Sequence, residues 1–335
     1  MRKKEILIMK NVFAFVLALT MLLTVSSIGY GQSAVRLKYG HANAIDNDVH
    51  IYALKWSEEV AKRSNGRIKI EVYPANQLGN IREMMEGVEL GTLDIGHGDT
   101  SMLSTVLPEM GLLALPFIYK GYDHAEKVID GSVGQELNEK LAAKRNMRPL
   151  GWMWNGFRNF CTKVPITKVA DCKNIKMRSP EAKIYMDTFT LLGMKPTPIP
   201  WGEVYTAMQT KVVDAMETPP ETIYKQGFYK LGKYVCNSRH IFSVVGPMIS
   251  EKKWQSLAKE DQKILSDSLK KVYDEQRVNA IKIEEEYHKK MAADGAVITK
   301  FENPQELIDL FTPYWTKYSE SCKAENLLKK IVETK

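Results

Sequence analysis

Two arginines, Arg158 and Arg178, are the residues of this sequence best suited to bind a ligand. Arg178 closes an alternating run of apolar and charged residues, which predicts a strand. Ser179 and Pro180 then predict a helix start, with serine as N-cap and proline in the first turn. A guanidinium beside a helix N-terminus favours a carboxylate, phosphate or sulfonate, because its planar fork donates two parallel hydrogen bonds. An exposed arginine paired with Glu181 is the alternative, and the segment alone leaves both open.

His97 and Asp99 form the second candidate group, in the segment GHGDT directly after a predicted strand. They could act as a general base and the residue that orients it, as in a secreted enzyme, although no nucleophile accompanies them. An acid at a strand end that hydrogen-bonds a ligand is the other interpretation. Glu285 and His288 make one ExxH pair, whereas a di-iron site needs two. We therefore expect no metal, no cofactor and no phosphate-binding glycine loop.

The N-terminus predicts a secretory signal peptide at residues 1–33. Basic residues lead, an apolar run follows over 12–25, and small residues come next. The run is too short to span a membrane, and no later stretch offers about 18 uninterrupted apolar residues. We therefore expect a soluble protein in the periplasm. Its net charge of +7 is spread over interspersed lysines and acids, which argues against a nucleic-acid partner.

Four cysteines would enter an oxidising compartment, where three pairings are possible. Cys161 and Cys172 are the best candidate pair, because they flank a lysine-rich loop and would fix the segment that carries both arginines. Four free thiols are the alternative, and both remain open. No cysteine spacing resembles a zinc site.

The order of predicted elements indicates an α/β protein. Residues 35–95 read as strand, helix, strand, helix, strand, which favours parallel pairing with ligands bound at the carboxyl ends of the strands. A second α/β unit begins near residue 150, with a helix over 182–192 and a strand over 212–216. Residues 260–294 contain no proline or glycine and predict one helix of about 50 Å that could bridge two domains.

Several longer segments together resemble one family. They are YPANQLGNIREMMEGVELGTLDI at 73–95, LPEMGLLALPFIY at 107–119, NGFRNF at 155–160, KNIKMR at 173–178 and PIPWGEVYTAMQTKVVDAMETP at 198–219. In order and spacing they resemble the solute-binding subunits of tripartite ATP-independent periplasmic (TRAP) transporters, the DctP family. The resemblance covers essentially the whole mature sequence.

The resemblance implies a two-domain periplasmic binding protein fold with a long helix crossing both domains. The N-terminal domain would comprise residues 34–155 plus 244–283, and the C-terminal domain residues 156–243 plus 284–335. The ligand would close between them.

The resemblance also implies roles for individual residues. Arg178 would form a salt bridge with the ligand carboxylate, and Arg158 would assist. Asp99 stands where relatives often carry a glutamate, and Thr218 where many carry asparagine. The ligand-binding candidates also include Trp201 as a wall aromatic, together with Glu217, Glu181, Phe160 and His41. Core packing is the alternative for the aromatics of this region, and we expect it for at least two of Trp152, Trp154, Phe157 and Phe160.

The sequence thus predicts a monomeric, non-enzymatic protein that binds a small organic acid and delivers it to the small and large TRAP membrane subunits. Acidic groups at Asp99 and Glu181 favour a monoanion bearing hydroxyls or a ring over a dianion. The alternatives are the secreted enzyme using His97 and Asp99 and a binding protein that feeds a signalling receptor.

Overall fold

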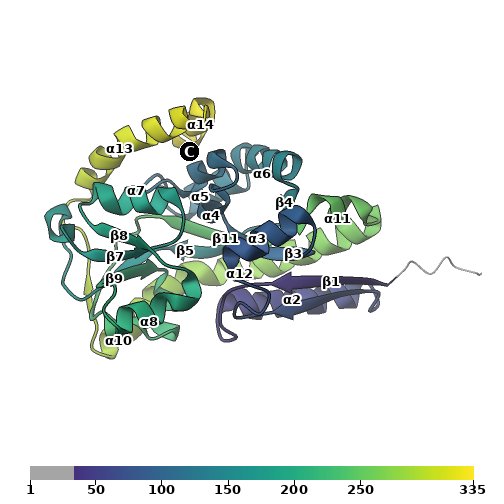
Figure 1. Ribbon diagram of the computed structural model, residues 1–335, viewed down its shortest axis with the longest axis horizontal. Coiled ribbons are helices and arrows are strands. Elements are labelled where there is room, and N and C mark those ends of the chain that lie inside the picture. The colour runs from purple at the N-terminus through teal and green to yellow at the C-terminus, as the bar shows by residue number, and fades with distance from the viewer. Residues whose placement is uncertain (1–33) are drawn as a thin grey trace, which may run out of the picture. The chain divides into compact units, whose positions relative to one another are not determined.

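The strands form two separate sheets of six strands each in a computed structural model that describes residues 34–335. The expected signal peptide, residues 1–33, lies outside the described residues. Both sheets are covered by helices (Figure 1), so the predicted α/β class is confirmed.

The first sheet has the order β2–β1–β3–β11–β4, and β5 also pairs with β11. Its strands are β1 (Val35–Gly40), β2 (Ile68–Tyr73), β3 (Ile95–Asp99), β4 (Met147–Pro149), β5 (Met153–Phe157) and β11 (Phe242–Ser250). β1 and β3 are parallel, as the strand and helix alternation predicted, whereas β11 runs antiparallel to β3, β4 and β5.

Helices α2 to α6 follow these strands in the sequence. They are α2 (Asp48–Arg63), α3 (Ile81–Leu90), α4 (Thr100–Leu103), the 3-10 helix η1 (Pro108–Ala114), α5 (Tyr122–Ile129) and α6 (Ser132–Arg145), with α11 (Glu251–Ser256) after β11. Local signals set the bounds of α3. Asn80 and Glu83 form a capping box at its start, and Gly91 ends it with φ 77°, a left-handed conformation that glycine adopts without strain.

The second sheet has the order β12–β10–β6–β9–β7–β8. Its strands are β6 (Asn159–Thr162), β7 (Lys176–Ser179), β8 (Lys195–Pro198), β9 (Ala215–Thr218), β10 (Tyr234–Cys236) and β12 (Val297–Thr299). The helices between them are η2 (Val169–Cys172), α7 (Lys183–Leu191), η3 (Trp201–Glu203), α8 (Val204–Gln209), α9 (Pro220–Lys225) and α10 (Phe228–Leu231). β7 is parallel to β8 and β9, and β6 is antiparallel to β9 and β10.

The chain passes between the sheets at two crossings and along one long helix. The first crossing joins β5 to β6, and the second joins β10 to β11. Helix α12 (Lys259–Ala293) packs on α2 and β5 of the first sheet's half and on α9 and β12 of the other (Figure 1). The predicted long helix is confirmed, whereas the predicted domain bounds stay a prediction.

The last two helices connect back to the first sheet's half. Helix α13 (Pro304–Ser321) packs on η1, and α14 (Glu325–Glu333) packs on α6. Residues 36–335 form one compact unit.

The predicted helix start at Ser179 is wrong. Ser179 is the last residue of β7, paired with Pro198 of β8, and its hydroxyl donates to the Pro180 carbonyl at 2.7 Å. The helix begins at Lys183, with Ala182 as its N-cap residue. Because strand pairing uses the serine backbone, the helix starts three residues later than the local pattern predicts.

The structure decides between the alternatives left open for the cysteines and for the aromatic segment. All four cysteines are free thiols, and Cys161 and Cys172 pack in different hydrophobic clusters. The four aromatics Trp152, Trp154, Phe157 and Phe160 are all buried, which confirms core packing for this segment.

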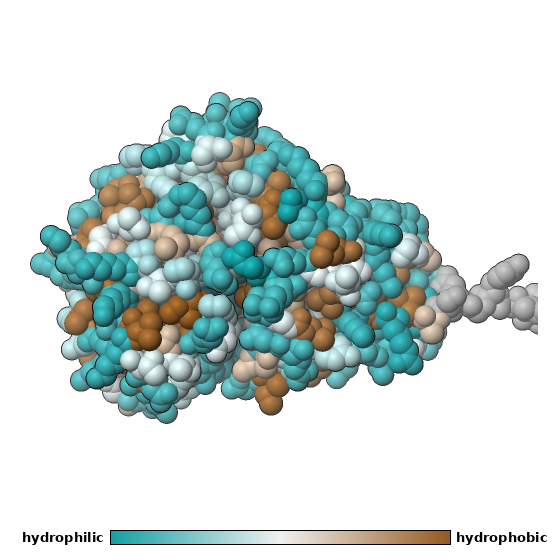
Figure 2. All heavy atoms as spheres, viewed as in Figure 1, coloured by the Kyte–Doolittle hydropathy of each residue, from teal (hydrophilic) through white to brown (hydrophobic). Residues whose placement is uncertain are grey.

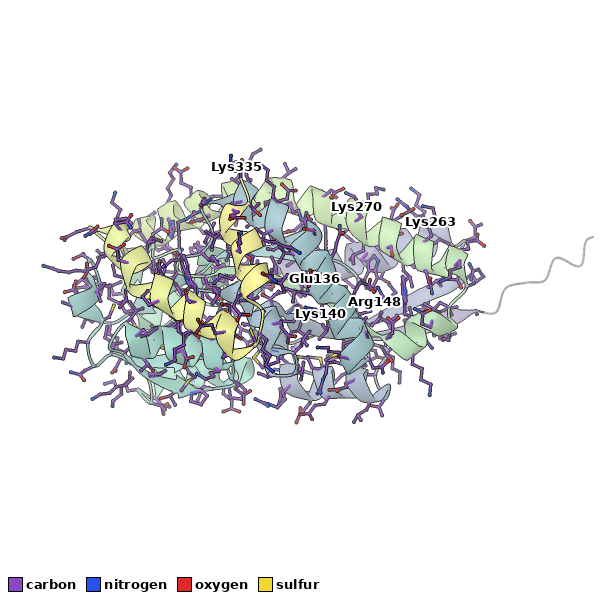
Figure 3. All side chains as sticks on the ribbon, turned by 90° about the horizontal axis from the view of Figure 1, so that it is seen from above. Glu136, Lys140, Arg148, Lys263, Lys270 and Lys335 are labelled. Carbon is purple, nitrogen blue, oxygen red and sulfur yellow. The ribbon has the colours of Figure 1, made fainter. Side chains whose placement is uncertain are left out.

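The surface is mainly polar. Figure 2 shows one face on which hydrophilic residues dominate and hydrophobic ones lie in small scattered groups. Lys263 and Lys270 stand on α12 (Figure 3), and each pairs with an aspartate one turn further along, Asp267 and Asp274. Across residues 34–335, every helix falls short of the length and apolarity that a bilayer crossing needs.

Candidate functional site

A cavity lies between the two sheets, and both contribute to its wall. β3 contributes His97 and Asp99, β9 contributes Thr218, β7 contributes Arg178, and the first crossing contributes Arg158. The cavity volume of about 80 Å³ is several times the roughly 10–15 Å³ that one water molecule needs. It has room for a small ligand rather than a lone water.

Arg178 is a buried cation that is only partly satisfied. Its side chain is 4% exposed, its Nε donates to the Ile199 carbonyl at 3.0 Å, and its guanidinium lies 5.6 Å from the centre of the Trp201 ring. Its only acidic neighbour within ion-pair distance in the described chain is Glu217, where Nη1 lies 3.8 Å from Oε1. Within residues 34–335 neither Nη atom has a hydrogen-bond partner, so both are available to an anion.

Burial makes the charge on Arg178 costly. Burial lowers the pKa of its guanidinium to about 10, and the nearby charge of Arg158 acts in the same direction, although Glu217 opposes both. An arriving carboxylate would supply the missing counter-charge and two hydrogen-bond acceptors.

Glu217 is the main partner of Arg158. Its Nε and Nη2 donate to the two carboxylate oxygens of Glu217, with Nη2 to Oε1 at 2.7 Å, and Nη2 also donates to the Glu217 carbonyl at 2.9 Å. Burial alone would lower the pKa of Arg158, but the Glu217 charge and hydrogen bonds raise it instead. Burial would likewise raise the pKa of Glu217, whereas the Arg158 charge holds it at about 2. The two therefore form a buried ion pair, and Nη1 of Arg158, which lines the cavity, has no hydrogen-bond partner within residues 34–335.

His240 supports Glu217 from the other side. Its Nε2 lies 3.2 Å from Oε2 of Glu217, and its Nδ1 lies 2.8 Å from the Ser238 hydroxyl. Burial lowers the pKa of His240, so the ring is neutral, and because an ionised carboxylate only accepts, the proton is on Nε2 and Nδ1 accepts from Ser238. Phe160 stacks on this ring at 4.3 Å between centroids. Glu217 and Phe160, both predicted to contact ligand, do not line the cavity, and they lie behind Arg158 instead.

Asp99 combines a structural contact with an open face. One carboxylate oxygen, Oδ1, accepts from the backbone N–H groups of Ser101 and Met102 at 2.9 Å each and from the Ser101 hydroxyl, as the N-cap of α4. Its other oxygen has no hydrogen-bond partner in the described chain, and the residue lines the cavity. A ligand hydroxyl could donate to it.

The pair that would serve an enzyme is not assembled. His97 lines the cavity, but its Nδ1 is buried without a hydrogen-bond partner, and no hydrogen bond joins His97 to Asp99 among the described residues. Burial lowers the pKa of His97 to about 4. His41 lies away from the cavity wall, and its Nε2 is 3.0 Å from Nδ1 of His50. Residues 34–335 also hold no group of three or more His, Cys, Asp or Glu placed to bind a metal ion.

Amide and hydroxyl side chains make up most of the remaining polar wall, and sequence reasoning missed all but one of them. The amides are Asn43, Asn76, Asn80 and Asn155, and the hydroxyls are Tyr185, Thr218, Thr222 and Ser243. Asn43 and Asn76 follow the carboxyl ends of β1 and β2, so the rule that ligands bind at those strand ends could have found them. Such groups both donate to and accept from ligand hydroxyls.

Two ion pairs join the halves beside the cavity. Glu181 lines the cavity and lies 3.8 Å from Arg82 of α3, measured from its Oε1 to Nη2. Lys225 of α9 contacts the Asp48 carboxylate of α2 at 3.2 Å and Glu221 at 2.6 Å. Both pairs need the two halves to be close together.

Comparisons with known proteins agree with this geometry. The model of the family described as bacterial extracellular solute-binding protein, family 7 (DctP), matches residues 39–321. The chain is 32% identical over 253 residues to the sialic acid-binding periplasmic protein SiaP of Vibrio cholerae, covering 76% of this chain and 79% of that protein. It is 30% identical over 246 residues to the 2,3-diketo-L-gulonate-binding periplasmic protein YiaO of Escherichia coli, covering 73% and 75%.

A solved structure shares the fold closely. It is a TRAP periplasmic solute binding protein from Haemophilus influenzae with bound L-gulonate, 28% identical, with a TM-score of 0.85 over 90% of this chain and 100% of that chain.

Proposed function

Because this chain belongs to the bacterial extracellular solute-binding proteins of family 7, the solute-binding subunits of TRAP transporters, we propose that its cavity binds a monoanionic sugar acid. The protein releases that acid to the small and large membrane subunits of a TRAP transporter. It works in the periplasm as a monomer, after removal of the predicted signal peptide, and binding is its only task.

Arg178 is the observation that carries this proposal. A buried guanidinium whose two Nη atoms have no hydrogen-bond partner in residues 34–335 is suited to bind one carboxylate by a two-point contact. Trp201 beside it forms an apolar wall that keeps water from the ion pair. This arrangement recognises the carboxylate group, whereas the rest of the cavity wall distinguishes one acid from another.

The rest of the wall favours a ligand with several hydroxyls. Four amides, four hydroxyl groups and the open oxygen of Asp99 offer donors and acceptors around the cavity. An apolar acid would cover these polar groups without offering them partners, and a polar group buried without a partner costs about 1–3 kcal/mol. The relatives named for L-gulonate, 2,3-diketo-L-gulonate and sialic acid support the same ligand class.

Calorimetry on a panel of acids tests the proposal. The panel contains L-gulonate, D-erythronate, D-glucuronate and D-galacturonate, with succinate and malate as dicarboxylates. D-sorbitol is the matched neutral control, because it has the carbon chain of L-gulonate with an alcohol in place of the carboxylate. We expect at least one sugar acid to bind and D-sorbitol not to bind.

Two results would contradict the proposal. One is a dicarboxylate that binds more tightly than every sugar acid in the panel. The other is a panel in which no acid binds, tested on protein that has been unfolded and refolded to remove any ligand carried through purification. Mass spectrometry of the released small molecules would then name the true ligand.

A further inference from the structure

His97 is a buried polar residue of the cavity wall that carboxylate binding at Arg178 does not use. It lies in β3 and is 3% exposed. Side chains alternate along a strand, so His97 and Asp99 share one face of β3. The other face is filled, because a Cβ atom at Gly96 would lie 3.0 Å from the Met84 carbonyl oxygen of α3. The fold therefore directs the imidazole toward the cavity that His97 lines.

The two neighbours of His97 across the sheet offer it no hydrogen bond. Pro247 of β11 stands opposite His97 and has neither a backbone N–H nor a polar side chain. On the other side, the parallel pairing of β1 with β3 brings His41 beside His97, with 6.5 Å between the ring centroids. Both His41 nitrogens already have partners, because Nδ1 accepts from the Asn43 backbone N–H at 3.3 Å and Nε2 lies 3.0 Å from Nδ1 of His50.

The missing partners determine which ring nitrogen of His97 holds the proton. Within residues 34–335 neither nitrogen has a hydrogen-bond partner, but only Nδ1 is enclosed by protein atoms. Burial lowers the pKa of His97 to about 4, so at neutral pH the ring is uncharged and has one N–H and one lone pair. An enclosed N–H without an acceptor is rarer in proteins than an enclosed acceptor without a donor. The proton is therefore on Nε2, the nitrogen that the cavity can reach.

A neutral N–H donor in this place suits a hydroxyl oxygen of a ligand. Asp99, two residues further along the same face, keeps one carboxylate oxygen open and only accepts hydrogen bonds. The first sheet thus offers a donor and an acceptor to the cavity, whereas Arg178 offers its guanidinium from the second sheet. A sugar acid carries a carboxylate and several hydroxyls, and one such ligand would contact both sheets at once.

We infer that His97 is a specificity-determining residue, whose Nε2–H donates to one hydroxyl of the bound sugar acid and so rejects acids that lack this hydroxyl. The inference rests on the proposed function and adds to it a contact from the first sheet. An acid without that hydroxyl covers the N–H and gives it no acceptor. Sites built to hydrogen-bond a hydroxyl discriminate sharply against its absence, because their own polar group is then left unpaired.

Monodeoxy analogues of the tightest-binding sugar acid of the calorimetric panel make this contact measurable. Each analogue lacks one hydroxyl and keeps the carboxylate. The readout is a discrimination factor, which is the affinity for the parent acid divided by the affinity for the analogue, measured by calorimetry for every analogue. A variant that only loosens the fold lowers both affinities and leaves this factor unchanged.

Three variants separate hydrogen bonding from shape. His97→Phe keeps a planar ring and removes both nitrogens, and we expect the discrimination factor of one analogue to fall from at least about tenfold to less than about twofold. His97→Gln places an amide N–H near the position of Nε2, and we expect it to keep most of that discrimination. His97→Asn places its amide near the position of Nδ1, and we expect it to behave like His97→Phe.

His50→Asn is the matched control. His50 does not line the cavity, and an asparagine Oδ1 can accept the bond from His41 in place of Nδ1. We expect every discrimination factor of this variant within about twofold of wild type. His97→Phe should fold with a melting temperature no lower than wild type, because carbon replaces an enclosed nitrogen that has no partner in residues 34–335. If it does not fold, the comparison of His97→Gln with His97→Asn carries the same test.

Nitrogen NMR of protein labelled at histidine tests the position of the proton directly. The His97 signals are those that disappear in His97→Phe. We expect the proton on Nε2 and a shift of the Nε2 resonance when the sugar acid is added, while Nδ1 keeps the resonance of an unprotonated nitrogen. A proton on Nδ1 would overturn the inference.

The binding results separate a failure of this inference from a failure of the proposed function. Wild-type protein that binds an acid of the panel, with the same discrimination factors as folded His97→Phe, overturns the inference alone. Wild-type protein that binds no acid contradicts the proposed function and the inference with it. Equal loss of discrimination in His97→Gln and His97→Asn would also overturn the inference, since the role of His97 would then be its shape rather than a donor at Nε2.

Discussion

Replacing Arg178 by alanine should abolish most of the affinity for a sugar acid. The ligand carboxylate would then be desolvated in a closed cavity without a partner. Arg178 is 4% exposed, so little water can take its place. Removing one member of such a pair costs about 2–5 kcal/mol, which corresponds to a loss of roughly 30-fold to several thousand-fold in affinity.

Lysine should not restore binding. Arg178 uses Nε for the Ile199 carbonyl at 3.0 Å and keeps both Nη atoms for the ligand. Because a lysine side chain has one nitrogen and no planar fork, it cannot hold that carbonyl and also donate two parallel bonds to a carboxylate.

The substitution of Arg178 by alanine should barely change the stability of the ligand-free protein. A pKa near 10 instead of the usual 12.5 means that the fold disfavours the charged form by on the order of 3 kcal/mol. Losing the bond to Ile199 and the contact with Trp201 offsets this relief. We therefore expect a melting temperature within about 5 °C of wild type without ligand, and no rise when ligand is added.

Calorimetry and thermal melting on the two variants decide the matter. Arg36→Ala is the matched control, since that side chain is 72% exposed and lies on β1 away from the cavity wall. A folded Arg178→Ala protein that binds sugar acids within about threefold of wild type would refute the reasoning.

Three further predictions follow from the same contacts. Arg158→Ala should destabilise the fold by about 3–5 kcal/mol in urea unfolding, because it leaves the Glu217 charge buried without its main partner, and should weaken sugar-acid binding less than Arg178→Ala; unchanged stability would contradict this. Burial first, and then the Asp48 charge, raise the pKa of Glu221 to about 7. Between the unfolded pKa near 4.3 and 7 the folded state binds the extra proton, so the free energy of unfolding falls as pH rises. Glu221→Gln should therefore raise the free energy of unfolding above that of wild type by about 1–3 kcal/mol more at pH 8 than at pH 5. Equal differences in urea midpoint at both pH values would contradict this. A bound sugar acid should lower the radius of gyration, because the pairs Arg82–Glu181 and Lys225–Asp48 join the two halves only when they are close; unchanged small-angle scattering would indicate a rigid preformed cavity.

Local patterns in the sequence predicted the elements well where one strand or helix decides the outcome. The alternation before Arg178 and the long apolar periodicity of 260–294 correspond to β7 and α12. The prediction failed at Ser179 because its backbone pairs with β8, a contact that no local pattern contains. The paired strand Val297–Thr299 likewise depends on β10, whose partner residues lie 63 positions earlier in the sequence.

The site could be predicted only in part for the same reason. Arg158 and Arg178 could be identified because arginines among aromatic and apolar residues at strand ends are rare. The family resemblance then assigned them to the ligand. The close pairing of Arg158 with a carboxylate depends on Glu217, which is 59 residues from Arg158 and meets it only through the pairing of β6 and β9. The asparagines of the wall were missed because isolated asparagines in loops are equally typical of turns.

The long helix has a consequence for how this protein can be taken apart. α12 gives one part of its length to α2 and β5 and another to α9 and β12, and α14 returns to α6. A fragment carrying only one sheet would expose half of a helix about 50 Å long and lose the strands that cross back. The two halves are therefore not exchangeable modules. A chimaera that joins the second sheet of one relative to the first sheet of another must carry a single α12, in which one part of the length suits one relative and the other part suits the other. Its cut points belong in surface turns rather than between the sheets.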